Sequence, residues 1–306
     1  MLSSFFSKSK PINYIAIAIY MLLLLGIAHY KKGVVLQSES IFLILAGIIL
    51  YILPMLLLNF LVQKNDLTYK GTYTILLYAF LTGILLNSLT DINILLASGL
   101  VVLGLRNILR LRDEKHMKAK IFNASLCIGI ASLAYFWSIG FIFLVFFGVF
   151  YFEPKNYRNW IIPLIGIVTV YTFANCFTLL FYDSFFTVTD YVDPVSFSFQ
   201  NYLVKDQLFS IGILSICIVF FLSIYLIKYS RKTANLKPIL RLMIVYLILA
   251  VGIGIVAPEK NTSELFFIAT PLAIIGTTYL ETNYNVLAKE INIWVFVLIP
   301  FTMLLF

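Results

Sequence analysis

Long apolar segments follow one another along the whole chain, separated by short polar turns. A helix needs roughly 20 apolar residues to cross a bilayer, because its backbone polar groups must be satisfied within the segment. The sequence therefore predicts an all-α, polytopic transmembrane helix bundle. The expected spans are residues 12–30, 41–62, 71–88, 92–105, 121–137, 138–152, 159–181, 207–228, 241–257, 264–280 and 291–306.

Two short polar breaks decide the number of spans. One contains Asn87, Ser88, Thr90 and Asp91, and the other is the run 137–140. If both are turns the chain has about 11 spans, which is the count we predict. A count of 10 follows if one of them is not a turn.

The composition excludes an ordinary soluble protein. Hydrophobic residues make up 61% of the chain and charged residues only 12%, where a soluble domain has roughly 25% charged residues. No segment has the composition of a separate soluble domain. We therefore predict a single integral membrane domain over residues 1–306.

The basic residues predict the orientation, because cytoplasmic loops carry the excess of Lys and Arg. With a cytoplasmic N-terminus, only Lys31, Lys32, Lys205 and Lys260 of the 22 basic residues fall on the outer side. The C-terminus then lies on that outer side. The net charge of +8 is explained by topology and by contacts with anionic lipids, so we expect membrane lipids and no nucleic acid as partners.

The longest outer loop, residues 182–206, combines carboxylates with aromatic rings and amides. Such side chains suit a sugar, because rings stack on its apolar face while acids and amides bind its hydroxyl groups. A carboxylate can also act as a general base in a transfer reaction. We single out Asp190 and Asp193 as candidate catalytic acids. The alternative is a loop that serves only as a structural lid.

A third candidate catalytic acid, Glu264, begins the span at 264–280, which contains Pro271. Ser263 is expected to cap this helix and Glu264 to lie in its first turn, where the helix dipole favours an anion. An acid at the membrane boundary, above a proline that frees a backbone carbonyl, is also typical of substrate sites in membrane proteins. Both interpretations stay open.

The predicted cytoplasmic stretch 106–120 is strongly basic. It is expected to be a topology signal that holds anionic lipid. The sharper hypothesis is a binding site for a lipid-phosphate headgroup, formed by Arg106, Arg110, Arg112 and Lys115.

Metal and cofactor chemistry find little support in the sequence. The three cysteines lie inside apolar runs, and the chain has only two histidines, too few for a histidine-cluster iron or zinc site. We expect no metal site and no cofactor.

Three segments carry a resemblance to a known family: LRNILRLRDEKHMKAKIFNASLCIGIASLAYFWS, YRNWIIPLIGI and PEKNTSELFFIATPLAIIGTTYLE. They resemble an uncharacterised family, a domain of unknown function, of polytopic inner-membrane proteins from Bacteroidota. The resemblance implies a Gram-negative cell inner membrane and makes the outer side the periplasm. It brings no catalytic residues with it.

A more distant similarity is one of architecture only. Many-helix glycosyltransferases that use polyprenyl-linked donors also have basic cytoplasmic loops and a functional periplasmic rim. They usually place an acid in a long first outer loop, whereas here that loop is residues 31–40 with Glu39 alone. Their catalytic assignment therefore does not transfer.

Three functions remain open from the sequence. The first is an enzyme or carrier that handles a lipid-linked or otherwise hydrophobic envelope precursor. The second is a non-catalytic subunit that scaffolds an envelope or secretion complex through a membrane-protein partner. The third is a small-solute transporter, which is disfavoured because neither inverted repeats nor paired broken helices are evident.

Overall fold

The computed structural model describes residues 2–33, 38–69, 71–187, 192, 194–230, 232–234, 236–258, 260–281 and 286–304, and only the backbone of residues 38–40. Every regular element within these ranges is a helix, which confirms the all-α class. The elements are α1 (Leu2–Phe6), α2 (Pro11–Lys31), α3 (Ser38–Lys64), α4 (Tyr73–Ile84), α5 (Leu86–Leu89), α6 (Ile92–Leu109), η1 (Arg110–Asp113), α7 (Met117–Ala134), η2 (Phe136–Phe141), α8 (Ile142–Phe152), α9 (Arg158–Tyr182), η3 (Gln200–Leu203), α11 (Lys205–Tyr229), α12 (Lys237–Val256), η4 (Ser263–Leu265), α13 (Phe266–Leu280) and α14 (Val286–Thr302).

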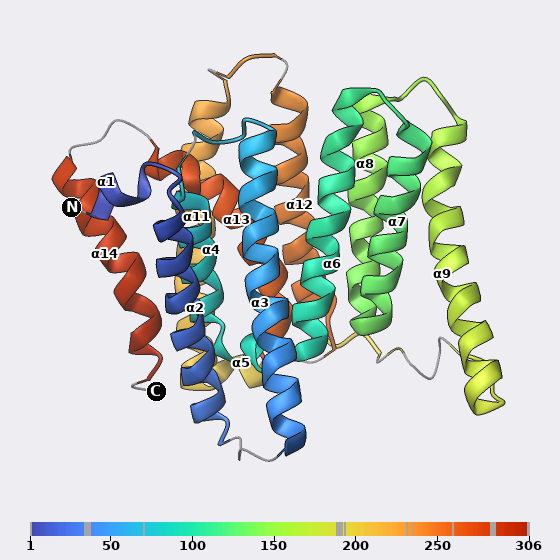
Figure 1. The fold of residues 1–306 in the computed structure, drawn as a ribbon, viewed down its shortest axis with the longest axis horizontal. Helices are drawn as coiled ribbons and strands as arrows, with labels where there is room; N and C mark the ends of the chain where they lie inside the picture. Colours follow the sequence, from blue (N-terminus) through green and yellow to red (C-terminus); the bar gives the residue numbers. More distant parts are fainter. Residues whose placement is uncertain are drawn as a thin grey trace.

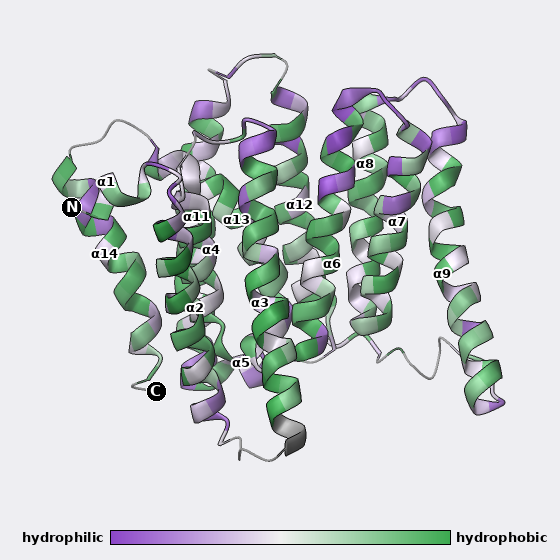
Figure 2. Cartoon of the chain, in the orientation of Figure 1, coloured by the Kyte–Doolittle hydropathy of each residue, from purple (hydrophilic) through white to green (hydrophobic). Residues whose placement is uncertain are grey.

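Eight helical segments in the described part of the chain are long and apolar enough to cross a membrane. They contain α2, α3, α6, α7, α9, α11, α12 and α13, and two shorter apolar helical segments cover Tyr73–Ile84 and Phe136–Phe152. Hydrophilic residues gather near the helix ends and hydrophobic residues along the helix lengths (Figure 2). This distribution suits a bilayer, so the chain has the helix content of a multi-pass membrane protein.

The helices run side by side, with α13 inside the bundle and α9 at one edge (Figure 1). The two differ in burial, since 89% of the apolar window around α13 is buried but only 11% of that of α9. Small residues attach α9 to α7, because a Cβ atom at Gly166 would lie 2.0 Å from the Ser125 Oγ. Close approach through small residues is a common way for membrane helices to pack.

The bundle has two ends of different character. We call the end that carries the α6–α7 turn, with Arg112 and Lys115, the basic end. The opposite end carries Glu264 and the last turn of α14, and we call it the cleft end. The start of α2 and the last turn of α14 lie at opposite ends (Figure 1).

The expected span at 71–88 is interrupted in the structure. α4 ends at Ile84, and Leu85 leaves the helical conformation with φ −100° and ψ 59° before α5 begins. Asp91 then caps α6, its Oδ1 accepting hydrogen bonds from the backbone N–H groups of Asn93 at 3.0 Å and Ile94 at 3.3 Å. The second expected break, 137–140, lies within the 3₁₀ segment η2, and the chain instead leaves the helical conformation just before it, at Tyr135, with φ −142° and ψ 104°.

The expected N-cap at Ser263 is wrong. The residue that precedes η4 is Thr262, with φ 70°, and its side chain makes no capping hydrogen bond. The Asn261 Oδ1 accepts a hydrogen bond from the Ser263 N–H at 3.1 Å, and this local turn takes the place of a Ser263 cap. Glu264 therefore lies in a 3₁₀ turn, and the α-helix begins only at Phe266.

Candidate functional site

A cavity of about 530 Å³ opens at the cleft end, and we call it the rim cleft. Its volume is in the range of small-molecule sites, roughly 300–1,000 Å³. Its walls come from the last turn of α2, the break between α4 and α6, the start of α11 and the turn before η4. The residues are Ala28, Lys31, Lys32, Ile84, Leu86, Asn87, Thr90, Asp91, Ile92, Asn93, Asp206, Ser210, Asn261, Thr262, Ser263 and Met303.

The interrupted helix α4–α5 forms one wall of the rim cleft. The break leaves the Ile84 carbonyl outside a regular helix, and the Ser210 hydroxyl donates a hydrogen bond to it at 3.0 Å. On the other side of the break, the Asn87 amide donates to the Asn261 carbonyl at 3.1 Å. Irregular backbone at membrane depth is tolerated where it lines a cavity and its polar groups are satisfied, and both conditions hold here.

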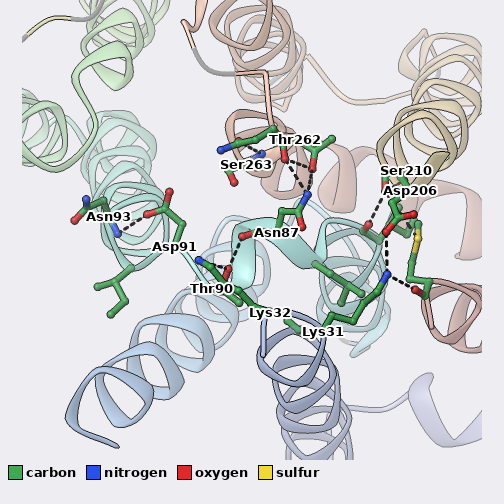
Figure 3. Close-up of a pocket in the computed structure, with 16 residues that line it drawn as sticks. Lys31, Lys32, Asn87, Thr90, Asp91, Asn93, Asp206, Ser210, Thr262 and Ser263 are labelled. Carbon is green, nitrogen blue, oxygen red and sulfur yellow. Dashed lines mark hydrogen bonds and ion pairs between the residues drawn. The ribbon is translucent and has the colours of Figure 1, made fainter. Parts of the chain in front are cut away.

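The charged residues of the rim cleft fall into separate groups (Figure 3). The Lys31 Nζ forms an ion pair with the Asp206 carboxylate at 3.0 Å. Lys32 lies between this pair and Asp91, and its Nζ donates to the Thr90 hydroxyl at 3.2 Å (Figure 3). Between these charges the cavity presents neutral amides and hydroxyls, which suit a ligand with several hydroxyl groups.

A second cavity of about 230 Å³ adjoins the rim cleft, and we call it the side pocket. The two cavities share Asp91, Asn93 and Asn261. The side pocket adds aromatic side chains and a carboxylic acid. Its residues are Asp91, Asn93, Ile94, Ala134, Tyr135, Phe136, Trp137, Pro258, Asn261 and Glu264.

Glu264 is the buried acid of this end, with only 1% of its surface exposed. Its Oε1 accepts a short hydrogen bond from the Tyr202 hydroxyl. Its Oε2 is buried and has no hydrogen-bond partner among the described residues. An unsatisfied buried carboxyl oxygen costs about 1–3 kcal/mol or more, and Glu264 is one of the residues that line the side pocket.

Tyr202 connects Glu264 to the outer loop, because it lies in η3, directly before α11. Burial raises the pKa of the Tyr202 phenol, and the neighbouring Glu264 carboxylate raises it further. The phenol therefore stays protonated and remains a donor to Glu264 over the physiological pH range.

Lys260 is fully buried close to Glu264. Its Nζ donates to the Gly254 carbonyl at 3.0 Å and to the Ile255 carbonyl at 2.6 Å, so it caps the C-terminus of α12. Burial lowers the pKa of Lys260, and the Glu264 carboxylate opposes that shift. The cation compensates part of the charge of Glu264 and satisfies carbonyl groups that a helix end leaves unpaired.

The other candidate acids predicted from the sequence, Asp190 and Asp193, lie outside the described residues. The loop that carries them does reach the site at its C-terminal end, through the hydrogen bond from Tyr202.

The predicted lipid-headgroup residues lie at the basic end and not beside Glu264. α6 has 18 residues, about 27 Å at 1.5 Å per residue, and it runs from the rim cleft to Arg106. The Arg106 guanidinium stacks 5.5 Å from the centre of the Phe60 ring, and the Arg110 carbonyl accepts from the Lys120 Nζ at 2.6 Å. Arg112 and Lys115 are exposed.

Several residues of the site were not singled out in the sequence. Lys31, Lys32 and Lys260 appear there only as exceptions to the charge distribution, and Asp91 only as part of a break. Their concentration on the less basic side is the signal that could have identified them. Among the described residues, no group of three or more histidines, cysteines or acids is placed to hold a metal ion.

The comparisons with known proteins give one match. A family model, described as a family of unknown function (DUF6427), matches residues 1–306. No curated protein and no solved structure matches the chain. Because the family model covers the whole chain, the protein belongs to DUF6427, a family of unknown function.

Proposed function

We propose that this protein is a cell inner-membrane protein with eleven spans, a cytoplasmic basic end and a periplasmic cleft end. The positive-inside rule supports this orientation, because the basic residues concentrate at one end. The test is cysteine accessibility in a variant without Cys127, Cys176 and Cys217. A cysteine at Lys205 should react with an impermeant maleimide in intact spheroplasts, and a cysteine at Lys115 only after lysis; the reverse pattern would contradict the orientation.

In this orientation, the protein binds an amphipathic envelope precursor, whose hydroxylated headgroup lies in the rim cleft and the side pocket. The cleft supports this function through its volume and through side chains that exchange hydrogen bonds with hydroxyl groups, among them Asn87, Asn93 and Thr262. The aromatic residues of the side pocket offer flat apolar surfaces on which a sugar ring can stack. A lipid-linked sugar combines both features.

The observation that carries this proposal is the free oxygen of Glu264. Glu264 lines the side pocket and its Oε2 lacks a hydrogen-bond partner among the described residues, so a ligand hydroxyl in the pocket would complete the hydrogen bonding of this carboxylate. The same carboxylate could take the proton of that hydroxyl as a general base, provided the ligand lies within hydrogen-bond reach. Binding alone makes the protein a carrier, and proton transfer to Glu264 makes it a transferase-like enzyme.

The test compares the lipid that copurifies with Glu264→Gln and with wild type. The protein is extracted from its own membrane in mild detergent, and bound lipids are quantified by mass spectrometry after solvent extraction. We expect wild type to retain one predominant glycolipid and Glu264→Gln to lose at least 90% of it. The matched control is Glu114→Gln, an exposed carboxyl at the basic end, which should retain it.

Equal retention by both variants would contradict the assignment of Glu264. A stoichiometric protein partner without a specific lipid would favour the second function, a non-catalytic subunit of an envelope complex.

A further inference from the structure

A small apolar groove runs between α2 and α3 beside the rim cleft, and we call it the α2–α3 groove. It has a volume of about 140 Å³ and is lined by His29, Lys32, Leu43, Ile44, Gly47, Leu89, Thr90 and Ile92. It shares Lys32, Thr90 and Ile92 with the rim cleft. A polar cavity and an apolar groove therefore meet at Lys32.

The groove reaches the outer surface of the bundle at Leu43, which is 52% exposed. Gly47, by contrast, is buried, yet a Cβ atom built on it would meet no other atom within 4 Å. Space beside a buried glycine is space inside the groove. In a bilayer the surroundings of Leu43 are lipid chains, so the groove connects the rim cleft sideways to the lipid phase.

Two residues that line the groove, His29 and the exposed Lys32, carry nitrogen atoms with unused hydrogen-bonding capacity. The His29 Nδ1 is buried and has no hydrogen-bond partner among the described residues. The Lys32 Nζ donates to the neutral Thr90 hydroxyl and pairs with no described carboxylate, since the ion pair of this region belongs to Lys31 and Asp206. An ammonium group has three donors, so Lys32 can hold an additional acceptor.

The two carboxylates that line the rim cleft are already engaged. Asp206 accepts from Lys31, and Asp91 accepts from two backbone N–H groups at the start of α6. Their charges are thus partly compensated, while Lys32, which is exposed, forms no ion pair with a described carboxylate. An anionic group is favoured beside Lys32, where it would form a charge-assisted hydrogen bond.

We propose that the α2–α3 groove is the lateral entrance for a phosphate-bearing lipid, whose chain lies in the groove and whose phosphate is held by Lys32 and His29. The headgroup beyond the phosphate then extends into the rim cleft. This inference rests on the proposed function for the identity of that headgroup, and it narrows the ligand to an anionic lipid. It also gives the ligand a route that does not cross the aqueous phase.

The experiment measures stabilisation of the purified full-length protein in mild detergent by short-chain lipids. The probe is dioctanoyl-phosphatidylglycerol, compared with dioctanoyl-phosphatidylcholine and with glycerol 3-phosphate. A ligand that binds only the folded state raises the melting temperature according to its affinity. We expect phosphatidylglycerol to bind at least tenfold more tightly than either comparison compound, because only it offers both a chain and an unopposed negative charge.

Two variants test the two halves of the site. Lys32→Gln removes the cation, and Gly47→Leu fills the groove; each should lower the affinity for phosphatidylglycerol at least tenfold. The matched controls are Lys205→Gln, an exposed lysine at the same end, and Gly252→Leu, another glycine with no atom within 4 Å of its Cβ position. Both controls should bind as wild type does.

Wild-type affinity in Lys32→Gln and Gly47→Leu would overturn the proposal. So would equal binding of phosphatidylcholine, or equal binding of glycerol 3-phosphate, which would indicate a site for free phosphate. Glu264→Gln separates this proposal from the proposed function: it should bind phosphatidylglycerol normally while it loses its native glycolipid. If Glu264→Gln binds phosphatidylglycerol normally but also keeps its native glycolipid, the proposed function is contradicted and the proposal for the α2–α3 groove stands.

Discussion

The two ends of the bundle both carry charged side chains but hold them in different surroundings. At the basic end, Arg112 and Lys115 are exposed, where charges contribute little to stability. At the cleft end, Lys260 and Glu264 are almost completely buried, where a charge is costly unless it is compensated. The cleft end, where the proposed binding site lies, thus holds a buried acid beside a buried cation, whereas the buried cation of the basic end, Lys120, is 7% exposed and donates to the Arg110 carbonyl.

If the two ends differ in this way, the largest loss in the free energy of unfolding is expected for a substitution at Lys260. Lys260→Ala leaves the Gly254 and Ile255 carbonyls and the Glu264 carboxylate without this cation, and should lower the free energy of unfolding by about 3 kcal/mol. Lys115→Ala should change it by less than about 0.5 kcal/mol. Denaturant unfolding in detergent micelles checks both, and similar losses in the two variants would break the distinction between the ends.

Glu281 extends the comparison between the two ends, because it lies at the basic end and yet is partly buried. Burial raises its pKa to about 7, against the opposing effects of contacts with Thr68 and Tyr69 and of the cations Lys232 and Lys289. A carboxyl with a raised folded-state pKa binds its proton more tightly in the folded state. The contribution of Glu281 to stability should therefore be largest below pH 4.5 and should be lost, by about 3 kcal/mol, as the pH rises from 4.5 through 7.

Glu281→Gln should remove this pH dependence and make the protein more stable than wild type at pH 8. Melting temperatures of both proteins between pH 5 and 8 provide the measurement. Parallel curves for the two proteins would show that Glu281 does not titrate in this range.

Tyr202→Phe probes the link between the outer loop and Glu264 with a smaller expected effect. Loss of the hydroxyl removes the side-chain donor to Oε1 and should cost about 1–2 kcal/mol. Combined with Glu264→Gln in a double-mutant cycle, the two changes should be non-additive by at least about 0.5 kcal/mol. Strict additivity would mean that the pair does not interact in the folded protein.

The exposed cations of the basic end should give the smallest effect. Arg112→Gln and Lys115→Gln should each weaken attraction to anionic vesicles by about 1 kcal/mol or less without changing the lipid retained in the rim cleft. Lipid analysis of these variants beside Glu264→Gln is the check. Loss of the retained lipid in either variant would place part of its binding site at the basic end.

Much of the fold could be predicted from the sequence. Apolar length and the positions of polar breaks predict the helices, because a bilayer imposes the same requirement on every span. The break at Leu85 could not be predicted, since Gly83, two residues earlier, stays within α4 and the Ile84 carbonyl is satisfied by Ser210, a residue distant in sequence. The expected cap at Ser263 failed because a local turn, in which the Asn261 side chain accepts from the Ser263 N–H, precedes η4.

The candidate site could be predicted only in part. Glu264 was identified from its position at a membrane boundary, and the structure adds the free oxygen and the adjoining cavity. Lys32 and Lys260 could not be assigned roles, because their surroundings depend on contacts between α2, α6, α12 and the outer loop. Composition and spacing along one chain contain no information on which ends of distant helices meet.

Native mass spectrometry of the intact protein, extracted from its own membrane in mild detergent, is the direct test for a lipid bound at Glu264. We expect a complex heavier than the chain by the mass of one anionic glycolipid, and loss of that mass in Glu264→Gln. A chain that carries a stoichiometric protein partner and no specific lipid would contradict it.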